Sequence, residues 1–141
     1  MVMGNDSISR ATVLIVDDEP VLRNILSNTI TRSGFRAVTA TDGVDGLEKL
    51  RGTRIDIVIS DIKMPRMDGL EFLAEAKVEF PEVPVILITA YANEFTGRDA
   101  FAAGDDDFIV KPFKNHEIKY ALERCLVRVQ QKRAKEKGKQ S

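Results

Sequence analysis

The sequence predicts an α/β protein built on one doubly wound, five-stranded parallel sheet in the order 2-1-3-4-5, flanked by five helices. Short runs rich in β-branched residues recur along the chain and are nearly unbroken, as in strands that are buried on both faces of a sheet. The segments between these runs place apolar residues at the spacing of a helical face. A length of 141 residues and a hydrophobic content of 43% suit a single core, so we expect one compact domain.

Four of the expected strands end at polar or charged side chains. The first strand ends at Asp17 and Asp18, the third at Asp61, the fourth at Thr89 and the fifth at Lys111. In the order 2-1-3-4-5 these strands lie side by side, and ligands bind at the carboxyl edge of such sheets. We therefore expect the five side chains to share one crevice. The five strands are expected at residues 12–16, 37–40, 55–60, 85–89 and 108–110.

Proline, aspartate and glycine mark the ends of the expected helices, because proline and aspartate favour helix starts and glycine favours helix ends. The helices are expected at about residues 20–33, 43–52, 70–80, 96–103 and 115–129. The fourth is short and contains Gly97, so its local stability should be low. The helical spacing predicts which residues of three helices face the core. They are Val21, Leu22, Ile25, Leu26 and Ile30 in the first helix, Leu70, Leu73, Ala74 and Lys77 in the third, and Ile118, Leu122, Cys125, Leu126 and Val129 in the last.

The residues of the crevice point to phosphoryl chemistry. Asp17, Asp18 and Asp61 repel one another unless they are protonated or share a cation. Mg²⁺ takes oxygen ligands and is commonly held by one or two carboxylates together with a phosphate oxygen. Lys111 supplies a compact positive charge and Thr89 a hydroxyl donor, and both suit phosphoryl oxygens. A carboxylate can accept a phosphoryl group directly, and Asp61, after the central strand, is the candidate nucleophile.

Four segments resemble the response-regulator receiver domains of two-component signalling. They are VDDEP with its acidic pair, SDIKMPRMDG with the phosphoacceptor, ITAY with its hydroxyl and VKPF with its lysine, all in the family's order and spacing. The resemblance covers Thr12 to about Val129. It implies that Asp61 accepts a phosphoryl group from a histidine kinase or a phosphotransfer protein. It also implies a regulatory domain, not an enzyme with a separate substrate.

The same resemblance implies a Mg²⁺ site. Its ligands would be Asp18, Asp61 and the backbone carbonyl of Lys63, with Asp17 acting through a water molecule. A cis peptide bond before Pro112 is also implied, at the turn that places the neighbouring lysine.

The resemblance further implies how phosphorylation is transmitted. Thr89 is expected to move toward the phosphoryl group and Phe108 to turn inward, which alters the surface formed by the fourth helix, the fifth strand and the last helix. Lys63 and Tyr91 occupy two positions that tune the lifetime of the phosphoryl group. Phe108 lacks the hydroxyl of the commoner tyrosine, and Asp105 stands where relatives usually have a small residue. The expected recipient is a downstream protein or an attached output domain, and phosphorylation allows a homodimer.

Composition argues against a nucleic-acid or membrane protein. The 21 basic and 22 acidic residues nearly balance, and the longest apolar run, residues 83–92, is too short to span a bilayer. The single cysteine agrees with a reducing compartment, so we expect a cytoplasmic protein.

We expect three segments along the chain: a flexible N-terminal segment at residues 1–10, the receiver domain at 11–130 and a basic tail at 131–141. Between Arg124 and Lys139 seven basic residues accompany one acidic residue. This tail is the solvated end of the last helix, the start of a linker to an output domain, or a docking segment for an acidic partner. It lacks an aromatic residue or a recognition helix, so DNA binding by the tail is not expected.

Two other functions fit an α/β domain of this size less well. A Mg²⁺-dependent phosphohydrolase that passes through an aspartyl phosphate usually places its two acids two residues apart on the first strand, whereas Asp17 and Asp18 are adjacent. Such enzymes also need a cap over the substrate. A flavin-binding electron carrier needs a phosphate loop rich in glycine and hydroxyl groups after the first strand, and the acidic residues 17–19 would repel phosphate there.

Overall fold

The computed structural model describes residues 11–89 and 107–140, and in them five parallel strands form one sheet. The order is β2-β1-β3-β4-β5, which confirms the predicted topology and fold class. The strands are β1 (Thr12–Val16), β2 (Arg36–Ala40), β3 (Ile57–Asp61), β4 (Val85–Thr89) and β5 (Asp107–Val110).

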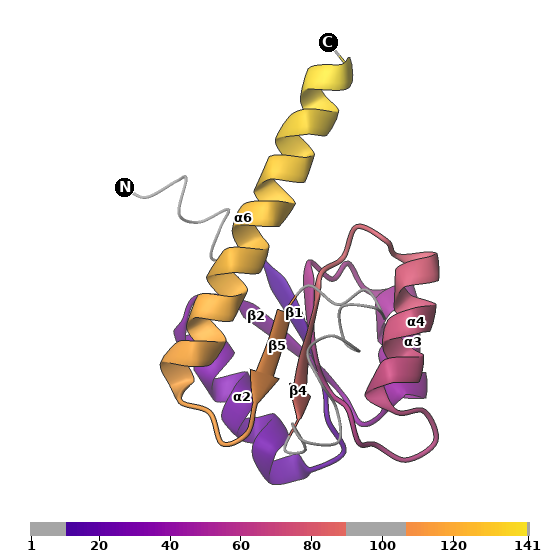
Figure 1. The fold of residues 1–141 in the computed structure, drawn as a ribbon, viewed down its shortest axis with the longest axis vertical. Helices are drawn as coiled ribbons and strands as arrows, with labels where there is room; N and C mark the ends of the chain where they lie inside the picture. The colour runs from indigo at the N-terminus through magenta and orange to yellow at the C-terminus, as the bar shows by residue number, and fades with distance from the viewer. Residues whose placement is uncertain (1–10, 90–106, 141) are drawn as a thin grey trace.

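Two pairs of helices cover the two faces of the sheet (Figure 1). Helices α2 (Pro20–Arg32) and α6 (Asn115–Gln140) pack on one face, and α3 (Gly43–Gly52) and α4 (Gly69–Glu79) pack on the other. The helix predicted at residues 96–103 lies outside the described residues. Among the described residues, no helix combines the length and the apolar character that crossing a membrane requires.

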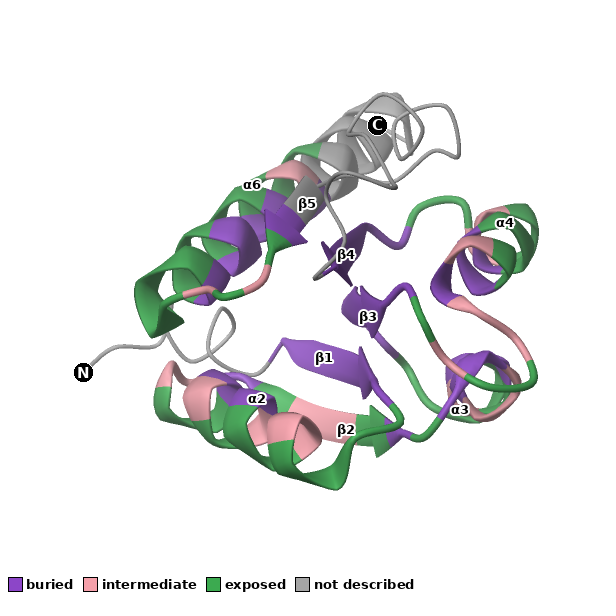
Figure 2. Ribbon diagram, turned by 60° about the horizontal axis from the view of Figure 1, so that its bottom comes forward, coloured by how far each residue is buried: buried purple, intermediate pink, exposed green. Residues whose placement is uncertain are grey.

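The central strands are buried on both faces, as their unbroken apolar sequences predict. Every residue of β1, β3 and β4 is buried, and Figure 2 shows these strands enclosed between the helices. Successive side chains of β1 point to opposite faces: Val13 and Ile15 pack with α2 and α6, whereas Leu14 and Val16 pack with α3 and α4. Two hydrophobic layers therefore hold the sheet and fix the position of its carboxyl edge.

Helix α2 faces the core along a narrower stripe than its apolar residues predict. Leu26 and Ile30 are buried, but Val21 is 72% exposed and Ile25 is 46% exposed. The inward positions are four residues apart, so the inclusion of Val21 and Ile25 in the core face was wrong.

Helix α4 is rotated relative to its predicted orientation. Phe72, Leu73 and Ala76 are buried, whereas Ala74 is exposed and does not belong to the core. Small apolar residues on adjacent faces leave the rotation of a helix open when spacing is the only guide. The contact that fixes this rotation is the packing of Phe72 into the cluster between the sheet and α3.

The bounds of β3 and α6 differ most from the sequence expectation. Strand β3 begins at Ile57 and ends at Asp61 itself. Just before it, the Thr12 amide donates to the side-chain Oδ2 of Asp56 at 2.9 Å, and the Asp56 amide donates to the Thr12 carbonyl at 2.9 Å. Helix α6 remains helical to Gln140 and extends past the end of the sheet (Figure 1).

Candidate functional site

The register of the sheet brings the ends of four strands together. Val16 pairs with Ser60, so the residues that follow them, Asp17 and Asp61, are neighbours at the carboxyl edge. Asp61 pairs with Ile88, the residue before Thr89 in β4. Thr89 in turn pairs with the residue before Lys111. Residues that are far apart in the sequence therefore meet at one place, as the predicted strand order requires.

Three carboxylates form the centre of this edge. Oxygen atoms of Asp17, Asp18 and Asp61 all lie within 4.8 Å of one another. Asp17 is only 2% exposed and Asp61 is buried, whereas Asp18 is exposed. Two contacts hold the turn after β1: the Glu19 amide donates to Asp17 Oδ1 at 2.8 Å, and Arg23 Nη1 donates to the Asp17 carbonyl at 2.8 Å.

Lys111, which follows β5, contacts the carboxylate cluster through Asp61. Its Nζ donates to Asp61 Oδ2 at 2.9 Å, and its backbone amide donates to the Thr89 carbonyl at 2.7 Å. The peptide bond between Lys111 and Pro112 is cis. Burial alone would lower the pKa of Lys111, but the hydrogen bond to Asp61 and the nearby negative charges outweigh burial and raise that pKa. Lys111 is therefore a cation at neutral pH.

The acidic cluster is a suitable donor set for a hard divalent cation. Burial, reinforced by the neighbouring charges of Asp61 and Asp18, raises the pKa of Asp17 to about 6, although the Glu19 amide and the Lys111 cation lower it. One lysine does not balance three carboxylates, and Mg²⁺ accepts such oxygen ligands while keeping several waters. The part of the chain that the structure describes thus fits a magnesium ion at this edge of the sheet.

The raised pKa of Asp17 makes the stability of the metal-free protein depend on pH. Ionised Asp17 destabilises the folded state above about pH 6, and this penalty disappears as the pH falls from 6 toward the ordinary value of 3.8. We expect Asp17→Asn to increase the free energy of unfolding at about pH 7.5 and to increase it much less at about pH 4.5. Urea denaturation in the presence of a chelator measures the difference; an equal effect at both pH values would contradict the assignment.

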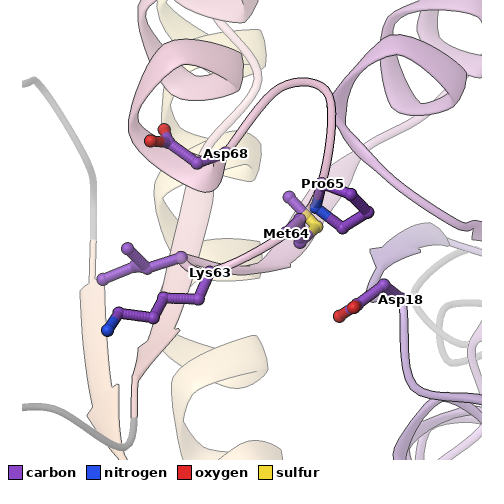
Figure 3. Close-up of a pocket in the computed structure, with 6 residues that line it drawn as sticks. Asp18, Lys63, Met64, Pro65 and Asp68 are labelled. Carbon is purple, nitrogen blue, oxygen red and sulfur yellow. The ribbon is translucent and has the colours of Figure 1, made fainter.

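The segment between β3 and α4 lines one side of the site. The Gly69 amide donates to the Ile62 carbonyl at 2.7 Å, and a Cβ atom at Gly69 would collide with the carbonyl oxygen of Asp61. Figure 3 shows Asp18 across a cleft from Met64 and Pro65, while the side chain of Lys63 extends away from Asp18. The cleft is lined by Asp18, Ile62, Lys63, Met64, Pro65 and Asp68.

Several residues singled out in the sequence cannot be placed in the site. Tyr91 and Asp105 lie outside the described residues, and Phe108 is described only as part of the backbone of β5. Sequence reasoning also missed Arg66, whose Nε donates to Asp42 Oδ2 at 2.6 Å. An exposed arginine in a turn gives no sequence signal for a partner in another loop.

The family model of the response regulator receiver domain matches residues 13–123, which is most of the chain. The chain belongs to this family. This match confirms the resemblance found in the sequence. Receiver domains are the regulatory domains of two-component response regulators.

Curated relatives of this receiver domain are longer proteins. The chain is 38% identical over 114 residues to the regulatory protein AtoC of Escherichia coli, covering 81% of this chain and 25% of AtoC. It is 38% identical over 117 residues to the probable transcriptional regulatory protein TcrX of Mycobacterium tuberculosis, covering 83% of this chain and 50% of TcrX. The chain thus spans between a quarter and a half of the length of these relatives.

Two similar solved structures are matched over nearly their full length. The receiver domain of NtrX from Brucella abortus is 34% identical, with a TM-score of 0.77, covering 81% of this chain and 97% of the NtrX chain. TrrA of Thermotoga maritima, determined in complex with Mg²⁺ and BeF, is 32% identical, with a TM-score of 0.75, covering 82% of this chain and 98% of TrrA.

Proposed function

We propose that Asp61 accepts one phosphoryl group from a histidine kinase or a phosphotransfer protein. The observation that carries this proposal is the 2.9 Å contact between Lys111 Nζ and Asp61 Oδ2 inside a cluster of three carboxylates. A carboxylate that is buried at a strand end, beside a lysine and other oxygen ligands, is suited to direct phosphorylation. The acyl phosphate would then control a downstream protein or an attached output domain.

The transfer needs a nucleophile and compensation of negative charge. A carboxylate oxygen of Asp61 forms a new bond to phosphorus, while the bond between phosphorus and the donor breaks and its electron pair leaves with the donor. Lys111, already hydrogen-bonded to Asp61, stays near enough to stabilise the transferred phosphoryl oxygens. The buried Thr89, at the adjoining strand end, supplies a hydroxyl donor for the phosphorylated state.

The proposed Mg²⁺ ligands are Asp18, Asp61 and the backbone carbonyl of Lys63, with Asp17 contributing through water. When bound, Mg²⁺ supplies positive charge that offsets the charge of the phosphoryl group. The three carboxylates within 4.8 Å of one another support this set, as does the position of Lys63 in the wall of the same cleft as Asp18.

Transmission of the signal is proposed to pass through Thr89 and Phe108. Phosphorylation adds roughly −1.5 to −2 charges and new acceptor oxygens, which would draw the Thr89 hydroxyl inward and let Phe108 follow. The altered surface would comprise residues 96–103, β5 and α6, and it could also support a homodimer. Lys63, which lines the cleft, and Tyr91, which lies outside the described residues, are proposed to tune the lifetime of the acyl phosphate. A switch from 1:99 to 99:1 requires about 5.5 kcal/mol of preference for the active state.

Incubation with a small phosphodonor such as acetyl phosphate tests the function. With Mg²⁺ we expect one phosphoryl group per chain, stable in acid and labile in base, because an acyl phosphate forms. With a chelator in place of Mg²⁺ we expect no incorporation, because the carboxylates then repel the donor. Intact-mass measurement distinguishes the two results. Absence of the group under both conditions, or equal incorporation under both, would overturn the proposal.

A further inference from the structure

The loop between β3 and α4 contains a strained turn at Arg66. The φ angle of Arg66 is 64°, in the left-handed region that residues with a Cβ atom seldom occupy. The Met67 amide donates to the Pro65 carbonyl at 2.7 Å, so Arg66 is the central residue of a three-residue turn. Turns of this form with a positive φ are rare and strained, and they persist only when surrounding contacts hold them.

An ion pair holds this turn against the start of α3. Arg66 Nε donates to Asp42 Oδ2 at 2.6 Å, and Asp42 is only 5% exposed. The other carboxylate oxygen accepts from the Asp45 amide at 2.9 Å and so caps α3. The hydrogen bond from Arg66 is also the main reason why the pKa of Asp42 is lowered. Because the fold fixes Asp42, the ion pair fixes Arg66.

Two backbone hydrogen bonds restrain the rest of the loop. The Gly43 amide donates to the Met67 carbonyl at 3.3 Å, which attaches the residue after Arg66 to the residue after Asp42. The Gly69 amide closes the loop onto the Ile62 carbonyl at 2.7 Å. Residues 63–65, which form the wall of the cleft opposite Asp18, lie between these restrained points.

We propose that Arg66 is a positioning residue for the phosphoryl-accepting site: through Asp42 it holds the β3–α4 loop so that the backbone of Lys63 stays in place opposite Asp18. This inference rests on the proposed function, since it assumes that the loop backbone helps to bind Mg²⁺. A loop that is ordered beforehand loses less conformational freedom when the cation binds, and the affinity is correspondingly higher.

The variant Arg66→Gly removes the ion pair but leaves the turn possible. Glycine adopts a positive φ without strain, so the turn remains accessible while the bond to Asp42 is lost. We expect Mg²⁺ to bind about tenfold more weakly, as is typical when a residue that supports a metal ligand is removed. Calorimetric titration with Mg²⁺ measures this change. The phosphorylation rate should fall at limiting Mg²⁺ and recover at saturating Mg²⁺, because Arg66 acts on cation binding and not on the transfer.

A second variant and a metal-free measurement keep the test independent of folding defects. Asp42→Asn preserves a good helix cap but removes the charge that Arg66 contacts, so it should also weaken Mg²⁺ binding. In the absence of Mg²⁺, amide hydrogen exchange at Gly43 should accelerate in both variants, because the loop that accepts this hydrogen bond is released.

The matched control is Arg51→Ala. Arg51 donates to both carboxylate oxygens of Glu79, at 3.0 and 2.9 Å, and this exposed pair joins α3 to α4 without contact to the loop. Mg²⁺ affinity and Gly43 exchange should stay at the wild-type values. Unchanged affinity and exchange in Arg66→Gly and Asp42→Asn would overturn the role of Arg66 while leaving the proposed function intact. A wild-type protein that binds no Mg²⁺ would overturn both.

Discussion

Replacement of Asp61 by asparagine is expected to abolish phosphoryl uptake from acetyl phosphate and Mg²⁺. The side chain keeps its shape and can still accept the hydrogen bond that Lys111 Nζ now gives to Asp61 Oδ2 at 2.9 Å. It loses the negative charge that makes the carboxylate a nucleophile toward phosphorus. Intact-mass measurement under conditions that fully modify the wild-type protein gives the result, and circular dichroism checks that the variant is folded.

A neighbouring aspartate provides the control for this loss. Asp68 lines the same cleft, and its Oδ1 accepts from the amides of Leu70 at 3.0 Å and Glu71 at 2.9 Å, so it caps α4. Asparagine caps helices as well as aspartate does, and Asp68→Asn should therefore fold and accept a phosphoryl group like the wild-type protein. Incorporation of a phosphoryl group by Asp61→Asn, or loss of incorporation in Asp68→Asn alone, would show that Asp61 is not the acceptor.

The meeting of the acidic residues and Lys111 was predictable from the sequence because it follows from strand order. The four strands that border the crevice are nearly unbroken apolar runs that stop at polar residues, and parallel strands present their ends at one edge. Once the order 2-1-3-4-5 is assumed, Asp17 and Asp61 follow adjacent strands, and Lys111 ends a strand two places from Asp61, close enough for its long side chain to reach the carboxylate.

Contacts that depend on side-chain direction could not be predicted in the same way. The pair between Arg66 and Asp42 joins two loops 24 residues apart, and neither residue belongs to a periodic pattern that could signal the contact. The rotation of α4 was mispredicted for a related reason, since Phe72 had no weight in a count of apolar spacing. Its size decides the packing: the large ring must fill the space between α4 and α3.

Phe72 should therefore be a major source of stability. Its side chain is 0% exposed and lies in the cluster between the sheet and helices α3 and α4. Phe72→Ala is expected to lower the free energy of unfolding by about 3–5 kcal/mol, because it removes buried apolar surface and leaves a cavity. Urea denaturation measures the loss, which is a large part of the roughly 5–15 kcal/mol that stabilises a typical domain.

The contact between Phe72 and Gly46 makes this prediction sharper. A Cβ atom at Gly46 of α3 would lie 2.8 Å from Phe72 Cε1, so Gly46→Ala alone should destabilise the protein by about 1–3 kcal/mol through overpacking. In the Phe72→Ala background the ring is gone, and the remaining close contact of this Cβ, Val16 Cγ2 at 3.2 Å, can relax into the cavity that the ring leaves. Alanine favours the helix over glycine by about 1 kcal/mol, so the same substitution should become stabilising. The two changes should then be coupled by well over the roughly 0.5 kcal/mol seen for independent sites. The wild-type protein, the two single variants and the double variant form a double-mutant cycle. Additive effects of the two substitutions in this cycle would mean that Phe72 does not hold α4 against α3.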